Sequence, residues 1–338
     1  MAKRDAATLS EPKPARLRVH AALADPELLP AVVVLACAVV LIAATKLFNP
    51  GSSFVDQLNA VLVTSIFLVV ASFGQGLTIL LGGIDLSIGV VVGLAAIMVS
   101  TLTNGSNAAI AWVVPATLGV AAFIGFVNGL GVALARVPPF IMTLASGISF
   151  YGVGLGFTSG LAQRPVAPAL QALMSGHWLG VPIPIYLIAG FVIIAAIFQN
   201  GTADGRQLYA IGSSPRAAWV FGLPISGLTI LAYALSGLCA GICGLLLAGY
   251  SSAATLDIGD PLLLPTIAAV VIGGARVVGG KGIYLGTFAG AIFLSALETI
   301  ITVLSLSQGL RNIIEGVIIV GALLLQSERW GALRRWSN

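Results

Sequence analysis

The side chains best able to do chemistry in this sequence are three acids within long apolar runs. Asp85 lies in the segment LGGIDLSIG at 81–89, and Glu298 and Glu315 stand in later apolar runs. A carboxylate at membrane depth is costly and usually faces a protein interior or a water-filled path. Two hypotheses follow. The three acids form a proton or cation relay, or Asp85 caps a helix while the two glutamates pair with Ser, Thr or Arg311.

The pair Gly82-Gly83 predicts a break in the helix just before Asp85. Within a membrane, a broken helix is tolerated only where protein or a cavity satisfies the exposed peptide groups. We expect Asp85 or Ser87 to cap the helix that restarts at Ile88. The segment is therefore interpreted as a broken helix beside a transport path.

A glycine-rich segment at 273–282 has the composition of a phosphate-binding loop but not its pattern. The motif needs Gly five positions before the Gly of the final Gly-Lys pair and Ser or Thr after the lysine, where this chain has Ala275 and Gly282. We interpret the segment as a cytoplasmic turn. This chain is then expected to bind no cofactor, and any ATP that drives it would be used by another subunit.

Catalytic and metal-binding constellations are not expected either. His20 and His177 stand in polar loops predicted to lie on opposite sides of the membrane. Cys239 and Cys243 share a helix face, but two thiols without a histidine or a further cysteine do not make a convincing metal site. We predict a protein that is not an enzyme and has no metal site.

Composition defines the class of protein. The chain has 338 residues, of which 58% are hydrophobic and 8% charged, whereas soluble domains carry about 25% charged residues. Its 41 glycines suit closely packed membrane helices. The sequence predicts an all-α, polytopic membrane protein that contacts the lipid bilayer and has no nucleic-acid partner.

Hydropathy divides the apolar part of the chain into ten predicted spans. They cover residues 28–48, 58–81, 86–101, 109–135, 140–158, 181–198, 226–250, 262–272, 283–304 and 312–325. With both chain ends in the cytoplasm, all but three of the 16 Lys and Arg residues fall on the cytoplasmic side, as the positive-inside rule requires. Eight full spans plus one re-entrant element in each half would keep the same placement of the ends.

The predicted organisation is a cytoplasmic arm at 1–27, a transmembrane domain at 28–326 and a cytoplasmic tail at 327–338. Within the domain, the largest polar loop, 199–225, holds a short helix that begins at Pro215 and offers a partner surface.

An inverted repeat is a further hypothesis. The glycine pairs at 82–83 and 273–274 hold corresponding places in the two halves of the chain, as do Gly147 and Gly316. With five spans in each half, interrupted helices of such a repeat would meet near the midplane.

Four motifs follow one another in the order of a known family. They are GGIDLS at 82–87, GFVNGL at 125–130 leading to RVPPFIMTL at 136–144, a GR…YAIG…P.AA pattern at 205–218, and a GG…GG.G…GT pattern at 273–287. Together they resemble ribose-type (monosaccharide) ABC transporter permeases, the inner-membrane component of binding-protein-dependent transport systems.

The resemblance implies a homodimeric or heterodimeric permease in a bacterial inner membrane. Its partners would be a cytoplasmic ABC ATPase and a periplasmic or lipid-anchored sugar-binding protein. The segment from Asp204 to Trp219 looks like the element that couples such a permease to its ATPase. One departure is Arg216, where the family commonly has an acid. It puts the charge pattern of the ATPase contact in doubt.

The resemblance points to two sets of functional residues, one for translocation and one for ATPase coupling. The translocation pathway between two permease subunits would involve Gly82, Gly83, Asp85, Ser87, Asn128, Pro138, Pro139, Thr143, Gly273 and Gly274. ATPase coupling would involve Asp204, Gly205, Arg206, Tyr209, Gly212, Pro215, Arg216, Ala217 and Ala218.

The expected function is import of a monosaccharide or similar small polyol. A permease for branched-chain amino acids, nucleosides or autoinducer-type sugars is the alternative within the family. An ion-coupled secondary transporter is the alternative of another class, and uptake without an added ATPase would favour it.

Overall fold

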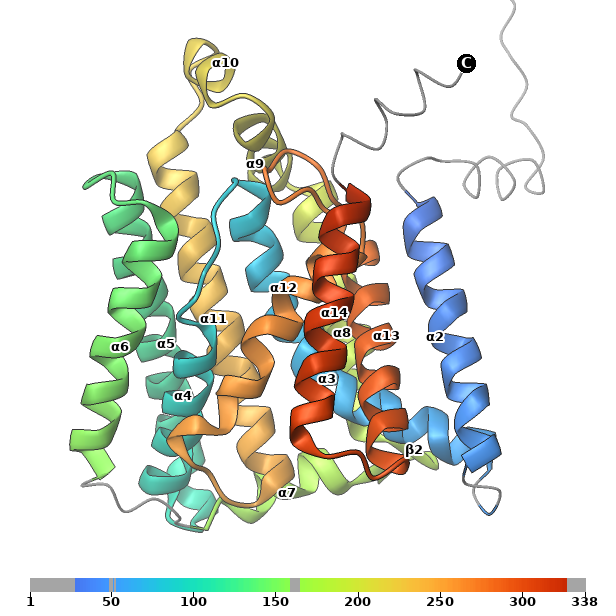
Figure 1. Cartoon of the computed structure of the whole chain (residues 1–338). Coiled ribbons are helices and arrows are strands. Elements are labelled where there is room, and N and C mark those ends of the chain that lie inside the picture. The colour runs from blue at the N-terminus through green and yellow to red at the C-terminus, as the bar shows by residue number, and fades with distance from the viewer. Residues whose placement is uncertain (1–27, 49–50, 52, 159–164, 327–338) are drawn as a thin grey trace, which may run out of the picture.

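The computed structural model describes residues 28–48, 51, 53–158 and 165–326, and the predicted arm and tail lie outside these ranges. The described part is almost entirely helical (Figure 1). Its elements are α2 (Leu29–Phe48), α3 (Phe54–Leu80), α4 (Ile88–Thr103), η1 (Asn107–Ala109), α5 (Ile110–Ala133), α6 (Pro139–Thr158), α7 (Pro168–Ser175), β1 (His177–Trp178), β2 (Val181–Pro182), α8 (Ile183–Ala196), η2 (Ile197–Gly201), α9 (Ala203–Ser213), α10 (Pro215–Val220), α11 (Ile225–Ser251), η3 (Leu256–Leu262), α12 (Leu263–Ile272), α13 (Tyr284–Val303) and α14 (Gln308–Gln326).

Each of the ten predicted spans coincides with a helix of this structure. Within the described residues, seven helices are long and apolar enough to cross a membrane: α2, α3, α5 with η1, α6, α8 with η2, α11 and α13. Helix α4 has 16 residues and α12 only 10, so both are shorter than a full span. The all-α membrane fold is confirmed, whereas the number of complete crossings and the side on which the chain ends lie stay predictions.

The two short helices lie in oppositely directed units (Figure 1). Helix α3 ends near α9 and α10, where α11 begins, so α3 and α11 run in opposite directions. The chain breaks after α3 to form α4, and it breaks after α11 to form η3 and α12. This arrangement fits the hypothesis of an inverted repeat.

The glycine pairs proposed as equivalent in that repeat are not equivalent. The pair at 82–83 precedes the short helix α4, whereas the pair at 273–274 follows the short helix α12. The counterpart of the break at 82–87 is instead the segment at 252–255, between α11 and η3. The predicted spans already included short ones at 86–101 and 262–272. The two pairs were matched because both follow a helix end, although only one of them follows the short helix.

Helix α11 is the centre of the packing and contacts α3, α4 and α5 at glycines. A methyl group at Gly125 would stand 2.1 Å from the carbonyl oxygen of Tyr233, and one at Gly237 would stand 2.2 Å from that of Ala121. Such contacts let two backbones meet directly, as small residues do between membrane helices. The interior of this helix group is therefore closed by backbone contact.

The predicted external loop at 159–180 contains regular structure where it is described. Helix α7 packs against α11, and a hairpin pairs His177 with Pro182. Its two central residues, Leu179 and Gly180, have φ values of 48° and 79°. Positive φ at both central positions is typical of a type I′ hairpin turn, and Gly180 adopts it at no steric cost.

Two glycines of α5 allow a matched test of this packing. We expect Gly125→Val to lower the stability of the folded protein by about 1–3 kcal/mol, because the added carbons collide with the α11 backbone. Gly119 in the same helix has open space around it, so Gly119→Val should have a much smaller effect. Thermal unfolding in detergent measures both, and equal melting temperatures would contradict the packing described.

Candidate translocation and coupling sites

The break between α3 and α4 is a non-helical segment at 82–87. Gly82 has a φ of 78°, a conformation that favours glycine. The N–H groups of Gly82 and Gly83 donate to the carbonyls of Ile79 (2.8 Å) and Thr78 (2.9 Å), which closes the end of α3. The chain then runs without helix to Ile88, so its next peptide groups need partners from elsewhere.

Side chains supply these partners. The Leu86 N–H donates to Thr143 Oγ1 at 2.9 Å, and the Thr143 hydroxyl lies 3.3 Å from the Ile84 carbonyl, to which it can donate. The Ser87 N–H donates to Asp85 Oδ1 at 2.9 Å. A break inside a membrane bundle is thus satisfied by protein groups, as the absence of bulk water there requires.

The Asp85 carboxylate is buried and accepts bonds on both oxygens. The Ser87 hydroxyl donates to Oδ1 at 2.6 Å, and the Ser236 hydroxyl of α11 donates to Oδ2 at 2.7 Å. Asn128 of α5 donates from Nδ2 to Ser87 Oγ at 3.0 Å. Bonds to a carboxylate are stronger than bonds between neutral groups, so this cluster ties the break to α5 and α11.

The predicted capping role of Asp85 or Ser87 is wrong. Ser87 holds the N-cap position of α4 but its side chain makes no capping bond; its hydroxyl donates to Asp85, and its Oγ accepts from Asn128 instead of from the helix backbone. The carboxylate accepts the N–H of Ser87 itself, two residues on, and closes a local turn.

The described contacts favour the structural hypothesis for the acids over the relay. Asp85 is bonded by Ser87 and Ser236, whereas Glu298 forms an ion pair with Arg311 at 3.3 Å. The side chain of Glu315 lies outside the described residues. No hydrogen-bonded route between Asp85 and Glu298 occurs among the contacts of the described chain.

The structure brings most of the predicted pathway residues together. Asp85, Ser87, Asn128 and Thr143 are buried in one hydrogen-bonded group at the break. A methyl group at Gly83 would lie 2.4 Å from the hydroxyl of Tyr233 and 3.4 Å from Pro139, so these two residues border the same group. Pro138 is exposed in the turn before α6.

Two predicted pathway residues lie elsewhere. Gly273 packs against the backbone of Gly286 in α13, and Gly274 lies against Pro30 of α2. Sequence reasoning also missed two members of the group at the break, Tyr233 and Ser236. They stand three residues apart in α11 and therefore share one helix face, which is the only signal that the sequence offers for them.

Helices α9 and α10 form the predicted coupling loop. Ser214 caps α10, because its Oγ accepts from the Ala217 N–H at 3.3 Å, and Thr202 caps α9 in the same way, with its Oγ1 accepting from the Gly205 N–H at 3.0 Å. The predicted coupling residues divide by exposure. Asp204, Arg206, Pro215, Arg216 and Ala217 are exposed, Tyr209 and Gly212 are partly buried, and Gly205 and Ala218 are buried.

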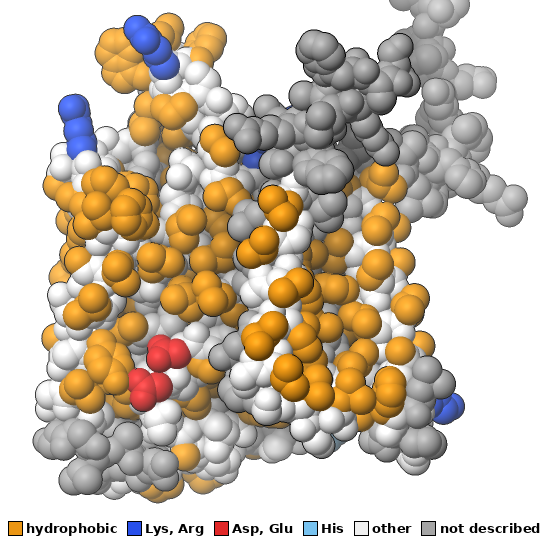
Figure 2. Space-filling model, in the orientation of Figure 1, with side chains coloured by type: hydrophobic (Ala, Val, Ile, Leu, Met, Phe, Trp, Pro, Cys, Tyr) orange, Lys and Arg blue, Asp and Glu red, His pale blue; other side chains and the backbone are white. Residues whose placement is uncertain are grey.

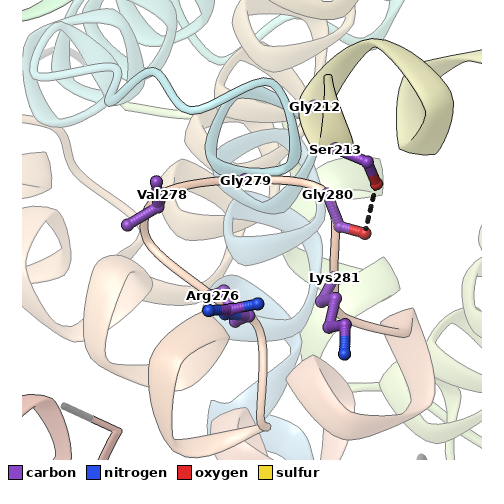
Figure 3. Close-up of a pocket in the computed structure, with 7 residues that line it drawn as sticks. All are labelled: Gly212, Ser213, Arg276, Val278, Gly279, Gly280 and Lys281. Carbon is purple, nitrogen blue, oxygen red and sulfur yellow. Dashed lines mark hydrogen bonds between the residues drawn. The ribbon is translucent and has the colours of Figure 1, made fainter. Parts of the chain in front are cut away.

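The buried side of α9 contacts the end of α3 and the turn at 276–282 (Figure 3). A methyl group at Gly212 would lie 1.8 Å from the Leu80 carbonyl oxygen, which itself accepts from Gly280 N–H at 2.9 Å. The Ser213 hydroxyl donates to the Gly280 carbonyl at 3.3 Å, and Tyr209 donates to the Gly282 carbonyl at 2.6 Å. These bonds fasten α9 directly beside the break.

The outer tip of α10 is apolar. Trp219, Val220 and Phe221 are 73%, 70% and 82% exposed. Figure 2 shows hydrophobic side chains gathered where α10 projects from the molecule, next to a basic one. The predicted loop at 199–225 contains these three residues, but none of them was among the residues expected to couple to the ATPase.

Comparison with known proteins assigns the chain to a family. A model of the family described as "Branched-chain amino acid transport system / permease component" matches residues 57–323, which include the break, α9, α10 and the turn at 276–282. The chain belongs to this family. This permease is 33% identical to the ribose import permease protein RbsC of Escherichia coli (strain K12), over 86% of its own length and 91% of that protein.

Other relatives cover similar lengths. The ribose import permease protein RbsC of Haemophilus influenzae is 30% identical, over 85% of this permease and 90% of that protein. The autoinducer 2 import system permease protein LsrC of Enterobacter sp. (strain 638) is 30% identical, over 85% of this permease and 83% of that protein. No solved structure matches significantly. The chain is therefore a multi-pass membrane permease component, a transport subunit without an ATPase site of its own.

The buried carboxylate at the break provides a test of the site. We expect Asp85→Ala to lower stability by at least about 1–3 kcal/mol, because two serine hydroxyls and one N–H lose their acceptor. Asp85→Asn keeps one accepting oxygen, so its stability should lie between that of Asp85→Ala and that of the unchanged protein. Asp204→Ala, at an exposed position, is the control. Melting temperatures in detergent measure all three, and an Asp85→Ala value equal to that of the control would refute the role of the cluster.

Proposed function

We propose that this permease is the transmembrane subunit of an ATP-binding-cassette importer for a monosaccharide or similar small polyol. The observation that carries the proposal is the likeness, over most of both chains, to permeases named for ribose import. Relatives named for autoinducer 2 import make that signal molecule the second candidate substrate. The family description makes branched-chain amino acids a third.

The proposed partners are a cytoplasmic ABC ATPase, a periplasmic or lipid-anchored binding protein and a second permease subunit, assembled in a bacterial inner membrane. ATP would be used by the ATPase subunit, and this chain would bind no cofactor. The exposed apolar tip of α10, formed by Trp219, Val220 and Phe221, suits a protein contact, since aromatic residues are enriched in such interfaces. In this proposal the tip enters the ATPase.

The contacts around α9 supply a physical route from ATPase to pathway. Movement of α9 would act on Leu80 at the end of α3 through Gly212, and on the turn at 276–282 through Tyr209 and Ser213. That turn touches the break itself, because a methyl group at Gly82 would lie 3.0 Å from the Val278 carbonyl. A displacement at the tip thus reaches the segment at 82–87 through backbone contacts.

Uptake in proteoliposomes tests the function. Labelled ribose should accumulate when the permease is reconstituted with the ATPase and binding protein encoded beside it and ATP is supplied, and the chain alone should transport nothing. Accumulation by the chain alone, driven by an ion gradient, would overturn the proposal in favour of an ion-coupled carrier. Transport of another substrate under the same ATP dependence would overturn only the assignment of the sugar.

A double aromatic variant tests the ATPase contact. We expect Trp219→Ala combined with Phe221→Ala to weaken ATPase binding by at least about tenfold, since buried aromatic anchors contribute 2 kcal/mol or more in many interfaces. Trp178→Ala, 61% exposed at the opposite end of the molecule, should leave binding unchanged. Co-purification at graded ATPase concentrations measures this, and equal affinities would place the contact elsewhere.

A further inference from the structure

A cavity of about 230 Å³ lies where α9 meets the turn between α12 and α13 (Figure 3). Gly212 and Ser213 of α9 line one side of it, and the turn from Arg276 to Lys281 lines the other. The charged side chains of this lining, Arg276 and Lys281, are both cationic and both exposed. A water molecule occupies about 30 Å³ in the liquid, so the cavity is large enough for a phosphate group.

The backbone of the turn brings the two cations together. The Arg276 N–H donates to the Lys281 carbonyl at 3.0 Å, so these two residues face each other where the turn begins and ends. Figure 3 shows both side chains below the arc of the turn. Positive charge is therefore concentrated at one place on the surface, and Arg and Lys side chains are the usual partners of phosphate oxygens.

The glycine N–H groups that line the cavity are already used within the protein. Gly279 donates to the Arg276 carbonyl at 2.9 Å, and Gly280 donates to the Leu80 carbonyl at 2.9 Å. A nucleotide-binding loop, by contrast, holds its phosphates with the N–H groups of its glycines. Recognition in this cavity must therefore come from the two charged side chains, which read the charge of a ligand and not the shape of a nucleotide.

The cavity stands at the edge of the apolar surface. Gly274, just before the turn, packs against the start of α2, because a methyl group there would lie 3.2 Å from Cβ of Pro30. From this point α2 exposes apolar side chains, with Leu29 55% and Val33 51% exposed. The polar headgroup layer adds about 5–7 Å on each side of the hydrocarbon core. Arg276 and Lys281, directly after Gly274, therefore lie at the level of lipid phosphate groups.

The end of the molecule that carries α9 and α10 is basic. Apart from Asp204, the charged residues that the structure describes at this end are cations: Arg136, Arg206, Arg216, Arg276 and Lys281. Figure 2 shows basic side chains standing out there. The positive-inside rule makes this the cytoplasmic end, and the cytoplasmic leaflet carries the anionic lipids that attract such segments.

We propose that the cavity between α9 and the turn at 276–282 binds the phosphate of an anionic phospholipid, held by Arg276 and Lys281. Basic pockets between membrane helices on the cytoplasmic side bind phospholipid headgroups in other proteins. A phosphate in this place also lies beside Gly212 and Ser213, so it joins α9 to the turn. The inference goes beyond the transport role proposed above, and its test uses neither a sugar nor an ATPase.

Lipid binding to the purified full-length chain in an uncharged detergent tests the site. Native mass spectrometry during titration with phosphatidylglycerol should show a tightly bound lipid that phosphatidylcholine does not replace. Arg276→Gln combined with Lys281→Gln should weaken this binding by about tenfold or more, because cations near the membrane surface attract anionic headgroups. The matched control, Arg136→Gln combined with Arg216→Gln, removes two exposed cations from the same end and should leave the binding unchanged.

Further variants separate a specific site from general surface charge. Arg276→Lys combined with Lys281→Arg keeps both charges and should keep the lipid. Each single glutamine variant should lose part of the binding, so the test holds even if the double variant does not fold. Equal losses in the two double glutamine variants, or equal binding of phosphatidylcholine, would overturn the site.

Inorganic phosphate distinguishes the lipid from a soluble anion. Millimolar phosphate should leave the phosphatidylglycerol in place, because the acyl chains add contacts with the apolar surface beside the cavity. Displacement of the lipid by phosphate alone would overturn the lipid as the occupant. Failure of ribose uptake, which is measured separately, would reject only the proposed function.

Discussion

The fold depends on one constraint, that every peptide group exposed by a broken helix in a membrane must find a partner inside the protein. At the break after α3, that need is met by Thr143 and Asp85, which bond the N–H groups of Leu86 and Ser87. Removing one partner would leave a donor unsatisfied in a medium without water. The Asp85 carboxylate therefore has a structural role. Its bonds to Ser87 and Ser236 hold α4 against α11.

Sequence predicted the helices well because apolar runs of membrane length have few other solutions in a bilayer. It also predicted the break, since Gly82-Gly83 followed by a carboxylate has a direct physical meaning. The partners of that carboxylate were out of reach, because Ser236 lies 151 residues away and an isolated serine in an apolar helix carries no distinctive signal. Gly273 lies apart from the break, against the backbone of Gly286, and its residue type could not show this, since a glycine can serve a path or a close helix contact equally well.

The same ambiguity of residue type governs the acids. The apolar sequence around Asp85 suggested a functional acid, whereas the structure shows a buried side chain that is hydrogen-bonded to its neighbours. Asp257 and Asp260 follow the long helix α11 in the sequence, and only the packing of η3 on Gly89 and Gly93 shows that they lie beside α4. Depth is a property of the folded chain. An acid near an apolar segment cannot be ranked for function until its element has been placed.

Glycine contacts also decide how movement can pass through the permease. Where α9 meets Leu80 at Gly212, and the turn at 276–282 meets Gly82 at Gly279, backbone touches backbone with no side chain to absorb a shift. Elements joined in this way move together or not at all, because packed interiors have little free volume. Beyond the break, the connection passes to hydrogen bonds from Asn128 and Ser236, which can exchange partners during a rearrangement. In the importer proposed above, the rigid contact would lie toward the ATPase and the exchangeable one toward the pathway, an arrangement that suits the conversion of ATPase docking into opening.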